Sequence, residues 1–217
     1  MEKILTFDCY GTLLNTAPIY NTVEIIAEKN GIDGQAAKVV FTNYEDRLMY
    51  GEDYIPYDEV VSQALEYCDL EMSCNIFYKN YERVLSAHEQ LQPFPDVLET
   101  LHTLKEKKYQ LALMSNSVDF IMQYHLQVLD NLFDEVILAE DAHAYKPQLS
   151  FFKYAEDSLH LQEKEHCHIA KGYWWDIVPC TKIGWKKIWV NREHKAGMKK
   201  YLPYQEIYTF SELLKLL

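Results

Sequence analysis

The chain has 217 residues with 21 Lys/Arg and 33 Asp/Glu, which gives a formal net charge of −12. A chain this acidic repels a phosphate backbone, so we do not expect nucleic acid as a partner. No apolar run approaches the length of a membrane span, and the first residues, MEKILTF, lack a secretory signal because their apolar stretch is too short. We therefore expect a cytoplasmic protein with no membrane partner. The cysteines have no zinc-type spacing, so we expect reduced structural thiols at Cys9, Cys68, Cys74, Cys167 and Cys180.

Helical patterns fill the first part of the chain after one short strand. Residues 3–8 form an apolar run that predicts a buried strand ending in Asp8. Thr16 and Pro18 start a helical pattern that Gly31 ends, and three more helices are expected at 35–50, after Pro56, and at roughly 75–90. The helix at 35–50 is expected to use the side that carries Val39, Val40 and Tyr44. QPFPD, residues 92–96, is turn material and predicts a boundary.

The remaining sequence alternates between helices and short apolar runs. Strands are expected within YQLALMSNS, DEVILAED, HCHIAKG, KKIWVNR and IYTF. Helices are expected at 96–107, after Ser117 as a candidate N-cap with Phe120, Tyr124 and Val128 on one face, after Lys146-Pro147, and in SELLKLL. This alternation predicts an α/β fold, a Rossmann-like parallel sheet with helices on both faces.

Reactive side chains follow several of these strands. In a parallel sheet the ligand crevice lies beyond the carboxyl ends of the strands. Those ends supply Asp8, then Ser115 and Asn116, then Lys146, then the segment from Lys171 to Asp176. A chance polar loop explains one such residue but not four in succession, so we expect a site at this edge.

These residues resemble the motifs of the haloacid dehalogenase superfamily of hydrolases, in the same order along the chain. The first motif reads DCYGTL from Asp8, the second is Ser115 in LMSNS, the third is Lys146-Pro147, and the fourth lies in HIAKGYWWD and ends at Asp176. The resemblance implies a core domain of residues 1–14 and 91–217 and an inserted helical cap domain of residues 15–90. The charge agrees with two units, because residues 1–90 carry 6 basic and 16 acidic residues whereas residues 91–217 carry 15 and 17.

The resemblance also implies a mechanism, in which Asp8 attacks the substrate and water hydrolyses the covalent intermediate. The candidate catalytic residues are Asp8, Thr12, Ser115, Lys146 and Asp176. Lys146 favours the ionised form of Asp8 through its opposite charge. Thr12 and Ser115 can donate hydrogen bonds.

Tyr10 departs from the phosphatases of this superfamily, which usually carry a second Asp there to protonate the leaving group. A tyrosine, with an ordinary pKa of about 10, is a poor substitute. Tyr10 shares the pocket with Asp8, because residues two apart on an extended chain face the same way. The L-2-haloacid dehalogenases have a similar Asp-x-Tyr-Gly-Thr, and their halide leaving group needs no proton.

The fourth motif departs further. The magnesium-dependent members have Gly-Asp-Ser-x-x-x-Asp, whereas this chain has Lys171 in place of the first acid and keeps Asp176. A lysine removes an oxygen ligand that magnesium needs. We expect the Lys171 ammonium to stand where the metal would be, paired with Asp8 or Asp176, and expect no metal site and no cofactor.

The resemblance to the dehalogenases is incomplete. Trp175-Asp176 is kept, but Lys171 and Tyr173 replace the Ser and Asn of those enzymes, and Phe152 replaces a Tyr. Their cap-domain Arg has no clear counterpart, and Lys38 and Arg47 are the candidates. The expected substrate-binding residues are Tyr10, Asn116, Lys171 and Trp175.

Three functions stay open. The leading one is a metal-free, haloacid dehalogenase-like hydrolase of a small molecule bearing a carboxylate. The alternatives are a magnesium-dependent small-molecule phosphatase and a catalytically silent ligand-binding homologue. Related enzymes are often dimers, so a homodimer also stays open.

Overall fold

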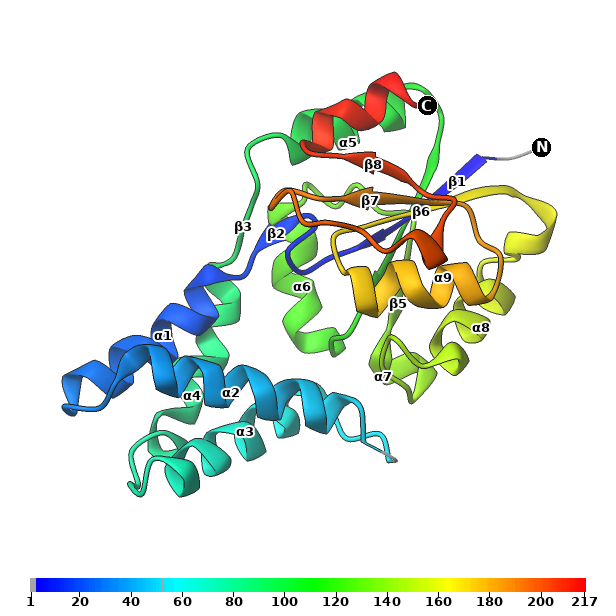
Figure 1. The fold of residues 1–217 in the computed structure, drawn as a ribbon. Helices are drawn as coiled ribbons and strands as arrows, with labels where there is room; N and C mark the ends of the chain where they lie inside the picture. The colour runs from blue at the N-terminus through cyan, green and yellow to red at the C-terminus, as the bar shows by residue number, and fades with distance from the viewer. Residues whose placement is uncertain (1–2, 52) are drawn as a thin grey trace.

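A single parallel sheet forms the centre of the protein in the computed structural model, which describes residues 3–51 and 53–217. The sheet has six strands in the order β5-β4-β1-β6-β7-β8, all parallel (Figure 1). Its strands are β1 (Lys3–Asp8), β4 (Gln110–Ser115), β5 (Glu135–Leu138), β6 (Glu165–Ala170), β7 (Lys187–Val190) and β8 (Gln205–Ile207). The carboxyl ends of these strands therefore meet at one edge, as the sequence predicted.

Helices cover both faces of the sheet (Figure 1). They are α5 (Val97–Glu106), α6 (Asp119–Val128), α7 (Ala139–Ala142), α8 (Leu149–Ser158), α9 (Val178–Lys182) and a final 3-10 helix (Phe210–Lys215). Helix α5 and the final 3-10 helix lie together on one face, and α8 and α9 lie on the other. The predicted α/β class with helices on both faces is confirmed.

Helix α6 uses a different face from the one we expected. Its buried residues are Ile121, Met122 and His125, whereas Phe120 and Tyr124 are nearly half exposed. Ser117 is not its N-cap, because that position belongs to Val118 and the Ser117 side chain bonds elsewhere.

A separate group of helices lies beside the carboxyl edge of the sheet (Figure 1). It contains α1 (Ala17–Lys29), α2 (Gly34–Met49), α3 (Tyr57–Glu71) and α4 (Tyr81–Ser86). The expected fourth helix at 75–90 is wrong as one element, since two 3-10 turns, Tyr78–Asn80 and Ala87–Gln90, flank the short α4.

Helix α2 also turns a different side inward. Besides Gly34 at its start, the residues that it buries recur every four positions, at Ala37, Phe41, Glu45 and Met49. Val39, which we expected on the inner side, is 48% exposed. The correction matters because it places a carboxyl group, that of Glu45, inside the molecule.

Two very short strands lie at the two ends of the segment that contains helices α1 to α4. Strand β2 (Leu14–Asn15) pairs antiparallel with β3 (Gln92–Pro93). We propose that this pair separates a core of residues 1–14 and 91–217, of which 1–2 lie outside the described residues, from a cap of residues 15–90. Tyr145 of the core also donates a hydrogen bond to the Ile55 carbonyl of the cap, at 2.8 Å. Among the described residues, no helix is long and apolar enough to cross a membrane.

Candidate active site

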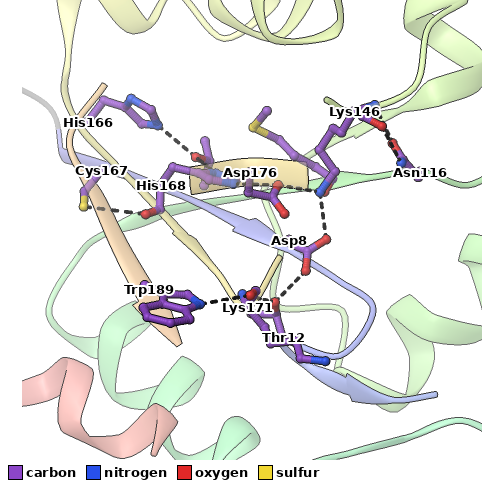
Figure 2. A network of polar contacts seen from close by, with 12 residues as sticks. Asp8, Thr12, Asn116, Lys146, His166, Cys167, His168, Lys171, Asp176 and Trp189 are labelled. Carbon is purple, nitrogen blue, oxygen red and sulfur yellow. Dashed lines mark hydrogen bonds and ion pairs between the residues drawn. The ribbon is translucent and has the colours of Figure 1, made fainter. Parts of the chain in front are cut away.

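One ammonium group lies between two carboxylates at the carboxyl edge of the sheet (Figure 2). Lys146 Nζ lies 2.7 Å from Asp8 Oδ1 and 2.8 Å from Asp176 Oδ1. It donates a third hydrogen bond to the Met114 carbonyl at the end of β4, at 3.1 Å. All three side chains are almost fully buried, so the structure brings together the expected acid, lysine and second acid.

Thr12 connects Asp8 to the loop that follows β6. Its Oγ1 donates to Asp8 Oδ2 at 2.5 Å and accepts from the Lys171 backbone N–H at 2.7 Å. The turn before it needs Gly11, whose φ of +77° lies in the left-handed region that glycine adopts at no steric cost. A Cβ on Gly11 would also lie 3.3 Å from the Lys171 side chain.

Asp176 is aimed by a π-helical turn, Tyr173–Ile177, directly after Gly172. The backbone N–H groups of Asp176 and Ile177 both donate to the Gly172 carbonyl, at 2.8 and 3.2 Å. A Cβ on Gly172 would lie only 2.3 Å from Asp176 Oδ2, so this approach of the carboxylate to the backbone needs glycine. Such single π turns are frequent at functional sites.

The two carboxyl groups differ in their electrostatics. Burial raises the pKa of Asp8, and the neighbouring Asp176 adds to this, against the opposing effects of Lys146 and Thr12. Burial also opposes ionisation of Asp176, but Lys146 and the buried His168 outweigh it and hold the pKa of Asp176 below its usual range. Lys146 stays charged, because its two carboxylate partners outweigh its burial and raise its pKa. Asp176 is therefore the acid of the pair that ionises more readily.

Ser115, the last residue of β4, and Asn116, which follows it, differ in whether they line the cavity. Ser115 is fully buried, its Oγ has no hydrogen-bond partner in the described part of the chain, and it does not line the cavity. Asn116 lines the cavity, but its side chain also accepts from the Lys146 N–H at 2.8 Å and donates to the Lys146 carbonyl at 3.1 Å. Asn116 thus holds the backbone that carries Lys146.

The expected pairing of Lys171 is wrong. Its ammonium lies 2.8 Å from Glu193 Oε1, a residue that follows β7, and not against Asp8 or Asp176. The cation between the two acids is Lys146 instead. Lys171 still lines the cavity, and its carbonyl accepts from the Trp189 indole N–H at 3.1 Å.

The hydroxyl of Tyr10 is already engaged. It lies 2.8 Å from Ser117 Oγ and 3.3 Å from His125 Nδ1, both on the core side. Burial, with nearby negative groups, raises the pKa of Tyr10 well above its ordinary value. Tyr10 lines the cavity as a neutral aromatic wall, and it is badly placed to protonate a leaving group.

A cavity of about 410 Å³ lies between the strand ends and the cap helices. Asp8, Tyr10, Asn116, Lys171, Trp175 and Asp176 all line it, so most of the expected site residues face one space. Of the two candidate cap cations, Lys38 lines the cavity, whereas Arg47 lies over the Tyr44 ring outside it. Phe152 is in the core, packed edge-on against Trp185.

Our sequence reasoning missed Glu45, which lines the same cavity from α2 and is 3% exposed. Its carboxyl lies 2.7 Å from the Tyr57 hydroxyl and 3.2 Å from the Tyr20 hydroxyl. Burial raises the pKa of Glu45 to about 7. The spacing of Ala37, Phe41, Glu45 and Met49, four residues apart in the sequence, was the signal that could have predicted a buried Glu45.

The donor set at the strand ends does not fit magnesium, which demands near-octahedral oxygen ligands. Of the four carboxylate oxygens of Asp8 and Asp176, three already accept from Lys146, Thr12 or His168. The position after β6 carries Lys171 rather than an acid. Within residues 3–51 and 53–217, no group of three or more His, Cys, Asp or Glu is placed to hold a metal ion.

Comparison with known proteins agrees with the fold. The family described as haloacid dehalogenase-like hydrolase matches residues 5–190. The chain therefore belongs to this family and is a hydrolase. It is 28% identical to (S)-2-haloacid dehalogenase 4A of Burkholderia cepacia, across 99% of this chain and 94% of that protein.

Two further similarities concern structure and chemistry. A solved structure described as that of a dehalogenase superposes with a TM-score of 0.85 at 26% identity, across 100% of this chain and 97% of that one. A glyceraldehyde 3-phosphate phosphatase of Methanocaldococcus jannaschii is 26% identical across 85% of this chain and 82% of that protein.

Proposed function

We propose that this hydrolase displaces halide from a small 2-halo carboxylic acid, with Asp8 as the nucleophile and no metal ion. The observation that carries the proposal is the position of Lys146 Nζ, 2.7 Å from Asp8 and 2.8 Å from Asp176. A buried ammonium favours the ionised carboxylate that an attack requires, without a metal. The relatives named as haloacid dehalogenases support the choice of substrate.

The reaction would proceed in two steps. In the first, an Asp8 carboxylate oxygen attacks the carbon that bears the halogen, the carbon–halogen bond breaks, and halide leaves with the bonding electrons. The product is an ester on Asp8. In the second step water attacks the Asp8 carboxyl carbon, the 2-hydroxy acid leaves, and Asp8 is restored. Asp176, in the cavity wall, would orient this water.

The engaged hydroxyl of Tyr10 supports halide as the leaving group. Its contacts with Ser117 and His125 leave no acid at this position, and a departing halide needs none. Lys38 and Lys171 would add positive charge to the cavity wall and so favour an anionic substrate, although Glu24 and Glu193 partly neutralise them.

Halide release from chloroacetate and from 2-chloropropionate tests the proposal, with magnesium and after chelation. We expect release that chelation does not reduce and that Asp8→Asn abolishes. Full activity of the Asp8→Asn variant, or activity that requires added magnesium, would contradict the proposal.

A magnesium-dependent phosphatase is the second candidate, and the similarity to the phosphatase of Methanocaldococcus jannaschii favours it. Tyr10 and Lys171 oppose it, since they remove the leaving-group acid and a metal ligand. Hydrolysis of small phosphate esters by the same preparation, with and without magnesium, separates the two functions.

The proposal includes a small-molecule substrate as the partner, with no nucleic acid or membrane, and a cytoplasmic location. The net charge of −12 supports the exclusion of nucleic acid. A homodimer belongs to the same proposal, and sedimentation equilibrium of the full chain tests it.

A further inference from the structure

Two histidines of β6 extend the buried polar network away from Asp176, on the side remote from Asp8 (Figure 2). His166 and His168 are two residues apart on the strand and so face the same side of the sheet. His168 is fully buried, and its Nε2 lies 3.1 Å from Asp176 Oδ1. Its Nδ1 lies 2.8 Å from Thr6 Oγ1, which in turn lies 2.8 Å from His166 Nε2.

The contacts fix where the protons of this chain lie if both rings are neutral. Asp176 Oδ1 already accepts from Lys146 and can only accept, so His168 carries its proton on Nε2. The bare Nδ1 then accepts from the Thr6 hydroxyl, and Thr6 Oγ1 accepts from His166 Nε2–H. Every hydrogen bond points toward Asp176, whose carboxylate sets the tautomer of His168.

This arrangement leaves one buried oxygen of Asp176 without a hydrogen-bond partner among the described residues. Lys146 and His168 both donate to Oδ1, which fixes the carboxylate through a single oxygen. Oδ2 has no hydrogen-bond partner in the described part of the chain, although Asp176 lines the cavity. A buried carboxylate oxygen without a partner is unfavourable unless something such as a water donates to it.

We propose that His168 is a positioning residue, which holds Asp176 so that Oδ2 receives the water that hydrolyses the Asp8 ester. The inference rests on the proposed function, because that function supplies the ester. His168 does not contact Asp8, whose partners are Lys146 and Thr12. It therefore acts in the second step of the reaction and not in the first.

The second step balances with Asp176 as the proton acceptor. Water oxygen bonds to the Asp8 carboxyl carbon, and Asp176 Oδ2 takes one proton from that water. The bond from this carbon to the substrate oxygen then breaks, and the departing oxygen takes the second proton to give the 2-hydroxy acid. Asp8 is left as a carboxylate. Asp176 then releases its proton to solvent, and the positive charge of this proton balances the negative charge of the halide released in the first step.

A purely structural role for His168 has to be separated from this one. The ring lies near Phe152 and Trp185, with centroids 6.3 and 6.2 Å away, so any substitution also disturbs packing. A packing defect would lower the stability and slow both steps. Loss of positioning would slow hydrolysis alone and let the ester accumulate.

The test compares His168→Leu with His168→Gln by rapid quench of halide release and by intact-protein mass. In His168→Leu we expect a burst of one halide per site and a covalent adduct on Asp8, with hydrolysis slowed by about 10- to 100-fold, the range seen when a partner behind a functional ligand is lost. His168→Gln should restore most of the rate, because its amide N–H can donate to Oδ1. Cys167→Ala, the next residue on the strand, should leave both steps unchanged.

Equal slowing of both steps without an adduct, or a Gln variant no faster than Leu, would overturn the proposal. Nitrogen-15 NMR of the wild-type ring gives a reading that needs no activity or substitution. We expect a proton on Nε2 of His168, and an Nε2 without a proton would overturn the proposal even if the variants fail to fold. Absence of halide release from the wild type would instead reject the proposed function, and the NMR reading would still decide the tautomer.

Discussion

The Tyr57 hydroxyl donates a hydrogen bond to Glu45 Oε1 at 2.7 Å, in the part of the cavity wall that helices α2 and α3 form. Tyr57 also lies 3.2 Å from His88 Nε2. His88 Nδ1 faces the Leu85 carbonyl at 2.9 Å, and burial lowers the pKa of His88 to about 4, so the neutral ring carries its proton on Nδ1. The bare Nε2 of His88 therefore lies beside a Tyr57 hydroxyl whose proton is donated to Glu45 Oε1. Burial of the Glu45 carboxyl outweighs the hydrogen bonds from Tyr57 and Tyr20, which favour the ionised form, so the pKa of Glu45 is raised to about 7.

Glu45 should make the stability of the protein fall as the pH rises. Its pKa is about 7 in the folded state against an ordinary 4.5, so the folded protein holds a proton that the unfolded chain releases. The stabilising effect is complete below pH 4.5 and is lost as the pH rises through 7. The change is about 3 kcal/mol, from 1.36 kcal/mol per pKa unit. The groups around the carboxyl are Tyr20, Tyr57 and Asp46.

Glu45→Gln provides the control, because an amide reproduces the neutral acid at every pH. We expect wild type and variant to have similar free energies of unfolding at pH 5, with the variant more stable by about 3 kcal/mol at pH 8. Urea unfolding at both pH values measures the difference. A difference that does not change with pH would mean that Glu45 is ionised throughout.

Lys146→Met should abolish turnover and destabilise the protein more at high pH than at low pH. The substitution leaves Asp8 and Asp176 buried without a counter-charge, and breaking a buried ion pair costs about 3–5 kcal/mol. Protonation of one acid relieves the penalty, so stability should recover toward pH 5. Lys153→Met, an exposed lysine of α8 that pairs with Asp157, should change neither property.

A topological rule predicted from the sequence which candidate site residues lie close together. Parallel strands end at one edge, so Asp8, Lys146 and Asp176 had to lie near one another once the strands were recognised. The destination of a long lysine side chain is not set by this rule, and Lys171 reaches Glu193 instead of the acids. Glu45 was missed because we predicted that α2 buries the side with Val39, Val40 and Tyr44, whereas it buries the side with Glu45. We predicted the strand that contains His168 but no role for its side chain. The sequence alone does not reveal that His168 contacts Asp176, which lies eight residues further on in a π turn.

Gly172→Ala should damage the site far more than it damages the fold. The added Cβ would meet Asp176 Oδ2 at 2.3 Å, so the carboxylate has to move. A misplacement of about 1 Å can cost 10²-fold in rate, and we expect a loss of roughly that size in halide release. Gly184→Ala is the matched control, because its φ is +76° but nothing lies within 4 Å of the added carbon. That control should lose about 1 kcal/mol of stability and no activity. Equal activity losses in the two variants would show that the placement of Asp176 does not limit the rate.

Tyr10→Phe separates halide release from phosphoryl transfer. The Tyr10 hydroxyl contacts His125 Nδ1 and Ser117 Oγ, so its removal leaves two buried polar groups unpaired and should lower stability by about 1–3 kcal/mol. The first step needs no proton for the leaving halide, so the single-turnover rate of halide release should change less than about tenfold, below the 10²–10⁴-fold that a general acid contributes. Tyr124→Phe, on the exposed side of α6, serves as the control for a lost tyrosine hydroxyl and should match the wild type in both measurements. A drop of 10²-fold or more in Tyr10→Phe, with an alkaline limb of the pH–rate profile that disappears in the variant, would make Tyr10 an acid and would restore the case for a phosphate ester substrate.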